Sequence, residues 1–256
     1  MNGLTAGFIG SGRVAAFMLE GFAHAEKGVN VILADIDPSV SALRSSFFAF
    51  ARDAGNDFSA AAGADIVFLA LHPPALPAGA ALISPHLSRD AIVVSLSPKI
   101  DISTLSGILK TDRIARFNPN AASAIGAGYN PVVYSPSLSQ ADRLKVSGLL
   151  SSLGGVVEIR EADLASYAVL GAMGPTYLWP IFDEMIVLGA EFGLTEEASL
   201  HLISHMAAGS AAMIEAGKSH AALMDMVPVK PMGADEGKIR ELFRTDLGAI
   251  FSKLNA

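Results

Sequence analysis

The amino-acid sequence predicts an α/β fold in which a doubly wound parallel sheet is followed by an all-helical region. The first half of the 256-residue chain alternates short apolar runs with stretches of helical periodicity, an order typical of such a sheet. A glycine-rich turn follows the first apolar run, and after about residue 160 no strand pattern remains. We therefore expect a nucleotide-binding-type domain over residues 1–160 and a helical domain over residues 161–256.

The expected strands are continuous apolar runs rich in β-branched residues. This composition is typical of parallel strands that are covered on both faces. The runs lie at residues 4–10, 30–35, 65–71, 91–96 and 113–117, and two more at 131–134 and 155–159 are expected to extend the sheet. A helix over residues 141–153 is expected to connect the last two runs.

Helical periodicity predicts a first helix over residues 13–27, directly after the glycine-rich turn. In the second half we expect helices over residues 161–173, 177–192, 195–216 and 235–254. Thr195 is a suitable N-cap for the third of these, because a threonine hydroxyl can accept a hydrogen bond from the first helical turn.

Composition and charge exclude several classes of protein. The chain has no cysteine, which excludes a disulfide framework, a thiolate nucleophile and a cysteine-ligated metal. The net charge is −7 and no run of lysine or arginine is present, so we expect no nucleic-acid partner. His201 and His205 are one helical turn apart but lack a third ligand, and we expect no metal site.

Two apolar segments resemble export or membrane signals without having their other features. At the N-terminus no basic region precedes the apolar run, and Arg13 and Glu20 interrupt it. Residues 168–189 are long enough to span a bilayer, but Asp183 and Glu184 would be costly in lipid. We interpret this segment as a buried helix and expect a cytoplasmic protein without membrane contact.

The glycine-rich turn has the pattern G-x-G-x-x-A at residues 10–15, between a strand and a helix. The first glycine permits a tight turn, the second lets the backbone approach a pyrophosphate, and the small third residue allows close packing. The following helix N-terminus offers free N–H groups to phosphates. We expect the turn to bind a dinucleotide through Gly10, Ser11, Gly12, Arg13 and Val14.

An acidic residue, Asp35, closes the second expected strand. A carboxylate at this point accepts a hydrogen bond from the adenosine ribose and repels a 2′-phosphate, which favours NAD over NADP. The alternative is that Asp35 caps a turn and that Ser39 and Ser41 bind a phosphate. We therefore expect NAD or NADP as the cofactor, with NAD favoured by this residue.

Four motifs resemble those of the pyrroline-5-carboxylate reductase family. Residues 7–12 (GFIGSG) resemble its opening G-F-I-G-x-G, and residues 65–73 (DIVFLALHP) resemble D-x-V-x-L-A-V-K-P, with His72 where lysine is usual. Residues 116–128 (RFNPNAASAIGAG) resemble R-x-M-P-N-T-P-x-x-x-G-x-G, and residues 174–177 (GPTY) resemble the G-P-A-Y that opens a long interdomain helix. The match is collinear over nearly the whole chain.

The resemblance implies an N-terminal Rossmann domain, a C-terminal helical dimerisation domain, and NAD(P)H-dependent reduction of a cyclic imine, as in proline biosynthesis. It also implies a small-molecule substrate and a homodimer or larger homo-oligomer, and it places Asn120 beside the nicotinamide. Leu71, His72 and Pro73 end an expected strand, at the edge where α/β sheets bind ligands, and we expect them to contact the cofactor as well.

The sequence departs from the family where the substrate should bind. The family's S-G-S-G-P-A-Y reads GAMGPTY at residues 171–177, which replaces both serines. Its T-S-P-G-G-T-T loop corresponds to PVKPMGAD at residues 228–235, so the paired threonines read as Ala234 and Asp235. Fewer hydroxyl donors and an added carboxylate disfavour an anionic amino-acid substrate, unless Lys230 compensates.

Three residues of the helical half are candidate catalytic groups. Thr176 and Tyr177 lie at the start of an expected helix. They either donate hydrogen bonds to a substrate heteroatom, or Thr176 caps the helix and Tyr177 is a buried aromatic residue. Lys230 lies between two prolines that stiffen its loop, either aimed into a cleft or solvated.

These candidates leave three hypotheses open. The first is a reductase of this family that acts on a C=N or C=O substrate. The second is a hydroxy-acid dehydrogenase on the same scaffold with Lys230 as proton donor. The third is a non-catalytic, cofactor-sensing protein.

Overall fold

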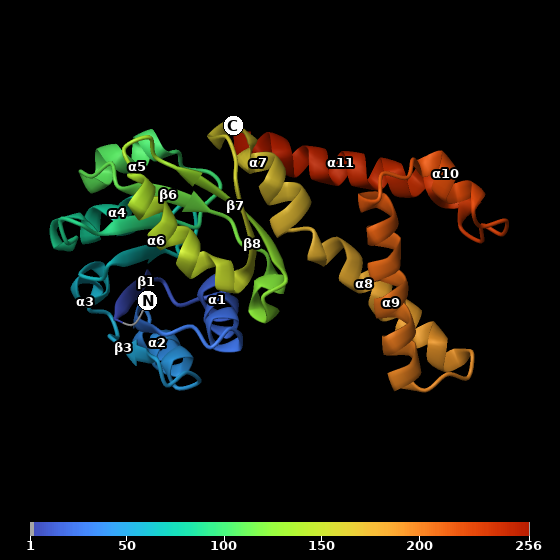
Figure 1. The fold of residues 1–256 in the computed structure, drawn as a ribbon, viewed down its shortest axis with the longest axis horizontal. Coiled ribbons are helices and arrows are strands. Elements are labelled where there is room, and N and C mark those ends of the chain that lie inside the picture. Colours follow the sequence, from blue (N-terminus) through green and yellow to red (C-terminus); the bar gives the residue numbers. More distant parts are fainter. Residues whose placement is uncertain (1–2, 256) are drawn as a thin grey trace. The chain divides into compact units, whose positions relative to one another are not determined.

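The computed structural model of the chain describes residues 3–255 and contains one eight-stranded sheet in the order β3-β2-β1-β4-β5-β6-β7-β8 (Figure 1). The strands are β1 Leu4–Ile9, β2 Val29–Ala34, β3 Ala51–Asp53, β4 Ile66–Leu69, β5 Ile92–Ser95, β6 Ile114–Phe117, β7 Gly128–Tyr134 and β8 Gly154–Glu158. The strand order runs outward from β1 in both directions, which confirms the doubly wound sheet.

Two features of the sheet differ from the expectation. The edge strand β3 was not expected, because its Ala-Arg-Asp sequence has no apolar run, yet it pairs in parallel with β2. Strand β7 runs antiparallel to β6, whereas the remaining pairs are parallel. Residues 118–127 connect β6 and β7 with only a 3₁₀ turn, η2 (Ala121–Ile125), and such a connection is too short for a parallel crossover.

Helices cover both faces of the sheet (Figure 1). They are α1 Arg13–His24, α2 Pro38–Ser45, α3 Phe58–Ala62, α4 Leu76–Ile83, α5 Ile102–Leu109 and α6 Gln140–Leu150. On one face α1 and α6 pack over a layer that includes Phe8 and Phe68, whose stacked rings have centroids 4.6 Å apart. On the other face α3, α4 and α5 pack over Val67 and Leu69. The central strands are therefore buried on both sides, as their continuous apolar sequences predict.

Close backbone approach sets the position of α1. Gly21 lies in the buried face of this helix, and a Cβ atom there would overlap the carbonyl oxygen of Ser123 and the side chain of Leu153. Glycine is thus required where α1 crosses η2. The expected end of this helix at residue 27 was wrong by one turn, because α1 ends at His24.

The chain continues beyond the sheet almost entirely as helices. They are η4 Glu161–Asp163, α7 Leu164–Tyr167, the π-helical turn η5 Ala168–Ala172, α8 Pro175–Glu191, α9 Glu196–Glu215, α10 His220–Asp225, the 3₁₀ turn η6 Gly233–Asp235 and α11 Glu236–Asn255. The single helix expected over 161–173 is thus three short pieces, and α10 was not expected. Thr195 caps α9 as expected, since its Oγ1 accepts a hydrogen bond of 3.1 Å from the Ala198 N–H.

The chain forms two compact units. One comprises Met1–Met173 with Phe251–Ala256, and the other comprises Gly174–Ile250. The sheet ends near the boundary expected at residue 160, and the compact units divide after Met173. In the part of the chain from residue 3 to residue 255, no helix combines the length and apolar character needed to cross a membrane.

The sheet unit has a large apolar core, whereas the helical unit has almost none. Between Gly174 and Ile250 the buried residues are Gly189, Ser199 and Ile203 alone. Gly189 and Ser199 mark the crossing of α8 and α9, where a Cβ on Gly189 would overlap the Ser199 hydroxyl.

The Gly21 contact can be tested by unfolding in urea. We expect Gly21→Ala to lower the free energy of unfolding by about 1–3 kcal/mol, because the backbone carbonyl that meets the new methyl group cannot move freely. Gly107→Ala in α5 is the matched control. It has open space around its Cβ and should be neutral or stabilising by about 0.5–1 kcal/mol. Equal unfolding midpoints for the Gly21 variant and the wild type would contradict this packing.

Candidate functional site

The glycine-rich turn lies at the carboxyl end of β1, at the edge where the parallel strands β2, β4, β5 and β6 also end. Gly10 has a φ of +96°, and a Cβ there would lie 2.6 Å from the carbonyl oxygen of Ala70. The Gly10 N–H donates a 2.8 Å hydrogen bond to the carbonyl of Ala34. The backbone conformation and packing of the protein therefore require glycine at this position, whether or not a ligand is bound.

The neighbouring residues leave groups free for a ligand. Gly12 is the N-cap of α1 without a side-chain cap, and the space around its Cβ position is open to 4 Å. Ser11 is fully buried, and its Oγ has no hydrogen-bond partner within residues 3–255. Arg13 is exposed, and Val14 packs against the core. An uncapped helix start, an unpartnered buried hydroxyl and open space beside a glycine fit the pyrophosphate of a dinucleotide.

Asp35 follows β2 and holds the glycine-rich turn. Its Oδ2 accepts a 2.6 Å hydrogen bond from the Ser11 N–H, and its Oδ1 accepts one of 3.1 Å from the Asp37 N–H. Through the Asp37 N–H the carboxylate caps the turn that follows β2, as the alternative interpretation of Asp35 expected. Through the Ser11 N–H it also contacts the glycine-rich turn that is expected to bind phosphate. Ser39 and Ser41 are engaged locally, donating to Asp37 at 2.7 Å and to the carbonyl of Pro38 at 3.1 Å.

The residues after β4 lie at the same edge of the sheet. The Leu71 side chain lies next to Gly10, 3.2 Å from the position that a Cβ would take there. His72 is exposed, and Pro73 lines a hollow of about 370 Å³ together with Lys99 and Asp101 from the segment after β5. Lys99 is a candidate that the sequence analysis missed, although its place directly after an expected strand could have identified it.

Two asparagines, Asn118 and Asn120, follow β6, and their side-chain amides differ in the hydrogen bonds that they make. The side-chain oxygen of Asn120 accepts a 3.1 Å hydrogen bond from the Ala122 N–H and caps η2. Asn118 is buried, and its Nδ2 has no hydrogen-bond partner in the described part of the chain. Asn118 thus has buried amide donors available to a ligand, and it is a residue that the sequence analysis did not select.

A buried arginine holds the segment that follows β5. Arg116 in β6 donates to the carbonyl of Pro98 at 2.6 Å and forms a 2.8 Å ion pair with Glu161. The same carboxylate oxygen of Glu161 accepts the Ile102 N–H at 2.8 Å. Arg116 and Glu161 thus fix both ends of the segment that carries Lys99.

The three candidates of the helical unit lie in two separate segments, the first turn of α8 and the loop after α10. Thr176 and Tyr177 lie in the first turn of α8, where Tyr177 packs edge to face on Phe243 of α11 with ring centroids 6.0 Å apart. Burial raises the pKa of the Tyr177 hydroxyl above its usual 10.0. Lys230 lies in the loop after α10 and lines a separate hollow without Thr176 or Tyr177.

The structure shows no metal cluster, as far as residues 3–255 extend. No group of three or more histidine, cysteine, aspartate or glutamate residues gathers there in a way that could hold an ion. The two α9 histidines instead interact along the helix, where His205 Nδ1 lies 2.8 Å from the His201 carbonyl oxygen.

These features define a class: a two-part protein with a dinucleotide-type phosphate turn on a doubly wound sheet, followed by a separate helical unit. Comparison with known proteins agrees with this class. Residues 5–99 match the family model described as NADP oxidoreductase, coenzyme F420-dependent, and residues 161–254 match the one described as pyrroline-5-carboxylate reductase dimerisation.

Individual relatives align over nearly the whole chain. The pyrroline-5-carboxylate reductase of Staphylococcus aureus (strain COL) is 25% identical over 97% of this chain and 93% of its own length. Among solved structures, the Plasmodium falciparum pyrroline carboxylate reductase with NADP bound has a TM-score of 0.82 and 20% identity, covering 99% and 98% of the two chains. The Coxiella burnetii pyrroline-5-carboxylate reductase has a TM-score of 0.74 and 22% identity, covering 99% and 97%.

These matches support the assignment of the chain to the pyrroline-5-carboxylate reductase family. The two family models match residues 5–99 and 161–254, and the Staphylococcus aureus (strain COL) relative aligns over 97% of the chain. The resemblance inferred from the four sequence motifs is thereby confirmed, together with the α/β fold and the helical C-terminal half.

A Cβ atom would overlap protein atoms at Gly10 and meets none at Gly12, so a substitution at Gly12 can test ligand binding apart from folding. We expect Gly12→Ala to change the free energy of unfolding by no more than about 0.5 kcal/mol, since its methyl group meets no protein atom. The same variant should bind NADH or NADPH at least about tenfold more weakly, because the methyl group takes the space of the pyrophosphate. Calorimetric titration and thermal melting measure the two effects. Unchanged cofactor affinity in this variant would argue against the site.

Proposed function

We propose that this protein is an NAD(P)H-dependent reductase that transfers a hydride to a cyclic imine or a related C=N or C=O substrate. The observation that carries the proposal is the phosphate turn, where a buried serine hydroxyl without a protein partner and an open glycine adjoin the uncapped start of α1. The names of the relatives and the NADP bound in the Plasmodium falciparum structure support the same activity.

The chain's own residues have mainly positioning work in such a reaction. A reduced nicotinamide supplies the hydride, and an iminium carbon is already electrophilic, so alignment contributes more than acid–base chemistry. The turn over Gly10–Gly12 and the N-terminus of α1 hold the phosphates. Leu71, His72, Pro73 and the Asn118-Pro119-Asn120 step lie at the ends of β4 and β6, farther along the same edge, and we assign them to the nicotinamide half.

Three side chains remain candidates for contact with the substrate. Tyr177 carries a phenol, which is protonated at neutral pH and can donate a hydrogen bond, and burial raises its pKa further above the usual 10.0. Thr176 offers a neighbouring hydroxyl, and Lys230 offers a cation for a substrate carboxylate. The free amide donors of Asn118 add a fourth candidate at the sheet edge.

The activity can be tested by following the absorbance of NADH and NADPH with 1-pyrroline-5-carboxylate, larger cyclic imines and oxo acids. We expect consumption of the reduced cofactor that depends on at least one imine. Asn118→Ala should lower kcat/KM about tenfold or more, because a desolvated donor to the ligand is lost. Ser139→Ala, which removes the cap of α6 and touches no residue assigned to the site, is the comparison variant. A protein that binds neither cofactor in a calorimetric titration would refute the proposal.

Asp35 supports NAD as the preferred cofactor within this proposal. Its carboxylate lies against the turn, so the charge opposes a 2′-phosphate. We expect Asp35→Asn to raise the ratio of kcat/KM for NADPH to that for NADH about tenfold, because the amide keeps an oxygen for the Ser11 N–H and loses the charge. Asp37→Asn removes a charge two residues away and should leave the ratio unchanged. Equal ratios in both variants and the wild type would exclude Asp35 as the selecting residue.

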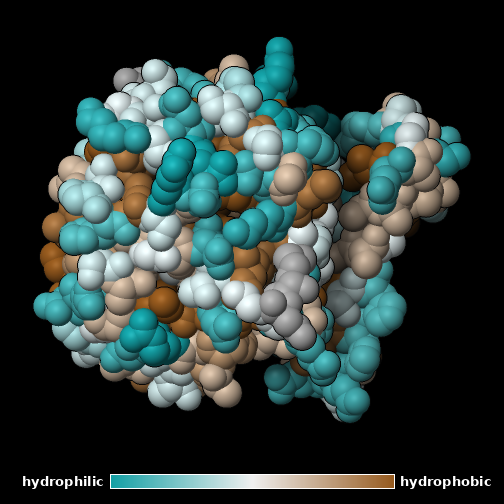
Figure 2. Space-filling view, turned by 60° about the vertical axis from the view of Figure 1, so that its left-hand side comes forward, coloured by the Kyte–Doolittle hydropathy of each residue, from teal (hydrophilic) through white to brown (hydrophobic). Residues whose placement is uncertain are grey.

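We also propose that the protein is a homodimer formed through its helical half, which matches the dimerisation model. With only three buried residues between 174 and 250, this unit leaves large side chains in water, including Trp179 (53% exposed), Leu202 (56%) and Ile214 (66%). A second copy that covers these side chains would supply the missing core. Figure 2 brings the sheet-bearing side of Figure 1 forward, and on that face hydrophobic residues reach the surface among hydrophilic ones.

Sedimentation velocity tests the assembly. We expect the wild-type protein to sediment as a dimer at micromolar concentration. Leu202→Asp should shift it toward monomer, because a carboxylate would be buried in an apolar interface. Leu82→Asp on α4 of the sheet unit is a matched control, since Leu82 is 54% exposed there and a charge should have no effect. A stable, folded wild-type monomer would disprove the assembly.

A further inference from the structure

The segment after β5 that carries Lys99 is tied to the sheet unit at several points. Arg116 donates to the carbonyl of Pro98 at 2.6 Å and to that of Ser97 at 3.4 Å. The Lys99 N–H donates to Ser97 Oγ at 3.3 Å. The Arg116 side chain is only 4% exposed, so little water reaches the guanidinium to replace these hydrogen bonds. The backbone at Lys99 is therefore held in place.

Glu161 supports this arrangement from beyond the last strand. One of its carboxylate oxygens accepts both the Arg116 guanidinium and the Ile102 N–H, each at 2.8 Å. A buried guanidinium without a counter-ion is costly, so the carboxylate stabilises Arg116 where it donates to the segment. The segment is thus held by one residue of the sheet and by one residue that matches the dimerisation model.

The segment presents a positive charge at the edge of the sheet. Lys99 is exposed, and its ammonium has no hydrogen-bond or ion-pair partner within residues 3–255. It lines the hollow of about 370 Å³ with Pro73, Pro74 and Asp101. The Asp101 carboxylate is engaged at the start of α5, where it accepts a 2.7 Å hydrogen bond from the Thr104 N–H and the helix dipole offsets its charge. The ammonium therefore stays available to a ligand.

The hollow lies on the nicotinamide side of the phosphate turn. Strands β2, β1, β4 and β5 are neighbours in this order. The phosphate turn follows β1, and Asp35, on the adenosine side, follows β2, so the segments after β4 and β5 lie on the opposite side. The nicotinamide is the part of the cofactor whose charge depends on its redox state, because the ring is neutral when reduced and positive when oxidised.

We propose that Lys99 makes the site bind the reduced cofactor in preference to the oxidised one, and that Arg116 and Glu161 are its positioning residues. The ammonium repels the positive ring of NAD⁺ or NADP⁺ and leaves the neutral ring of NADH or NADPH unaffected. This inference rests on the proposed function, since it takes a nicotinamide cofactor as the ligand. A reductase benefits from the preference, because the oxidised cofactor is its product and competes for the same turn.

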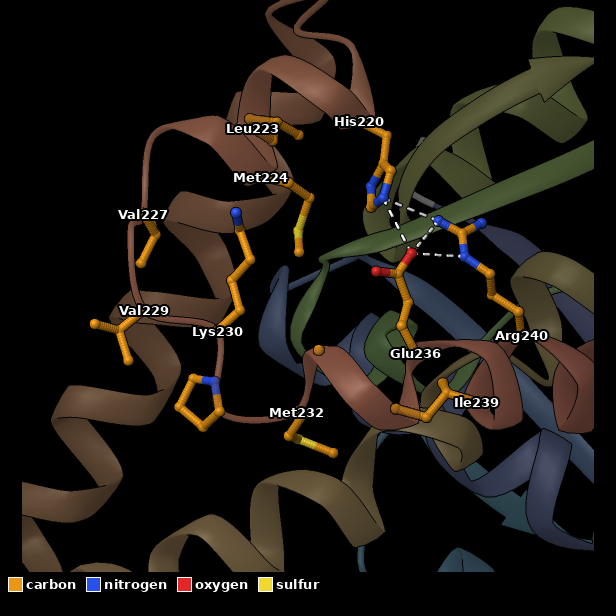
Figure 3. A pocket seen from close by; sticks show the side chains of 12 residues that line it. His220, Leu223, Met224, Val227, Val229, Lys230, Met232, Glu236, Ile239 and Arg240 are labelled. Carbon is orange, nitrogen blue, oxygen red and sulfur yellow. Dashed lines mark hydrogen bonds and ion pairs between the residues drawn. The ribbon is translucent and has the colours of Figure 1, made fainter.

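Lys230 is the rival source of such a charge. It lines a hollow of about 650 Å³ in the helical unit (Figure 3). In Figure 3 Lys230 lies on one side of this hollow, and Glu236, which accepts a 2.8 Å hydrogen bond from Arg240, lies on the other. Because Lys99 and Lys230 belong to different compact units, variants of the two residues show which unit supplies the charge.

The test is a calorimetric titration of the full-length protein with NADH, NAD⁺ and ADP-ribose, which lacks the nicotinamide. Their 2′-phosphorylated forms replace them if the wild type binds only those. We expect Lys99→Met to lower the ratio of NADH affinity to NAD⁺ affinity about threefold to tenfold, by tightening the binding of NAD⁺. Lys99→Arg should keep the ratio, and neither variant should change the affinity for ADP-ribose. Lys110→Met is the matched control, because Lys110 is an exposed lysine at the other end of α5.

A double variant tests the positioning residues. Arg116→Met with Glu161→Gln removes the ion pair without leaving a buried charge unpaired, so the protein should fold, as thermal melting shows. We expect this variant to lower the same ratio at least about twofold and to keep the affinity for ADP-ribose, because Lys99 is no longer held. Arg113→Met with Asp142→Asn removes another ion pair of 2.8 Å and should leave the ratio unchanged.

Hydrogen exchange without any cofactor measures the positioning separately. Exchange of the Lys99 and Ile102 amides should be faster in the Arg116/Glu161 double variant than in the wild type, because the segment has lost the donor to its carbonyls. The Arg113/Asp142 double variant should exchange at these two amides as the wild type does.

Three results would overturn the inference. They are an unchanged ratio in Lys99→Met, a ratio that Lys230→Met lowers and Lys99→Met does not, and an Arg116/Glu161 double variant that loses ADP-ribose affinity as much as NADH affinity. In each case the wild type binds the cofactor, so the proposed function stands. A wild-type protein that binds none of these ligands would refute the proposed function, and this inference with it.

Discussion

Burial of the central strands on both faces is the constraint on which the rest of the sheet unit depends. Strands β1, β4, β5 and β6 carry apolar side chains toward both helical layers, so none of these side chains is available for chemistry. Polar groups that can face a ligand therefore gather where the strands end, and Arg116 within β6 is engaged by Glu161. The glycine-rich turn, Asp35, Leu71–Pro73, Lys99 and Asn118 all follow strands at the carboxyl edge, and their common position is a result of this burial.

Features that depend on local sequence were predicted well. The phosphate turn needs only a strand, two glycines and a helix in succession, and each part can be recognised within fifteen residues. The apolar strands and the cap at Thr195 are equally local. The antiparallel β6–β7 pair was not predicted, because its cause is the absence of a crossover helix between two strands, and a list of apolar runs does not reveal strand direction.

The candidate site was predicted only in part. The role of a side chain depends on which of its hydrogen-bonding groups are already used by neighbouring protein atoms, and the sequence does not show this. Asn118 and Asn120 are the same residue type two positions apart, and sequence resemblance favoured Asn120. In the fold, Asn120 gives its oxygen to η2, whereas Asn118 is buried with unused donors. The turn-capping hydrogen bonds of Asp35 and the hollow around Lys230 likewise arise from contacts between segments that lie apart in the sequence.

The ion pair between Arg116 and Glu161 limits how freely the two halves of this chain can be exchanged with those of relatives. The arginine belongs to the sheet, but its carboxylate partner comes after the last strand, at the first residue that matches the dimerisation model. A chimera joined at residue 160 would therefore leave a buried guanidinium without its counter-ion unless the incoming half also begins with an acid. The two halves of the sequence thus fold as different architectures, yet one ion pair joins a residue of each half. Recombination between relatives should therefore preserve this pair.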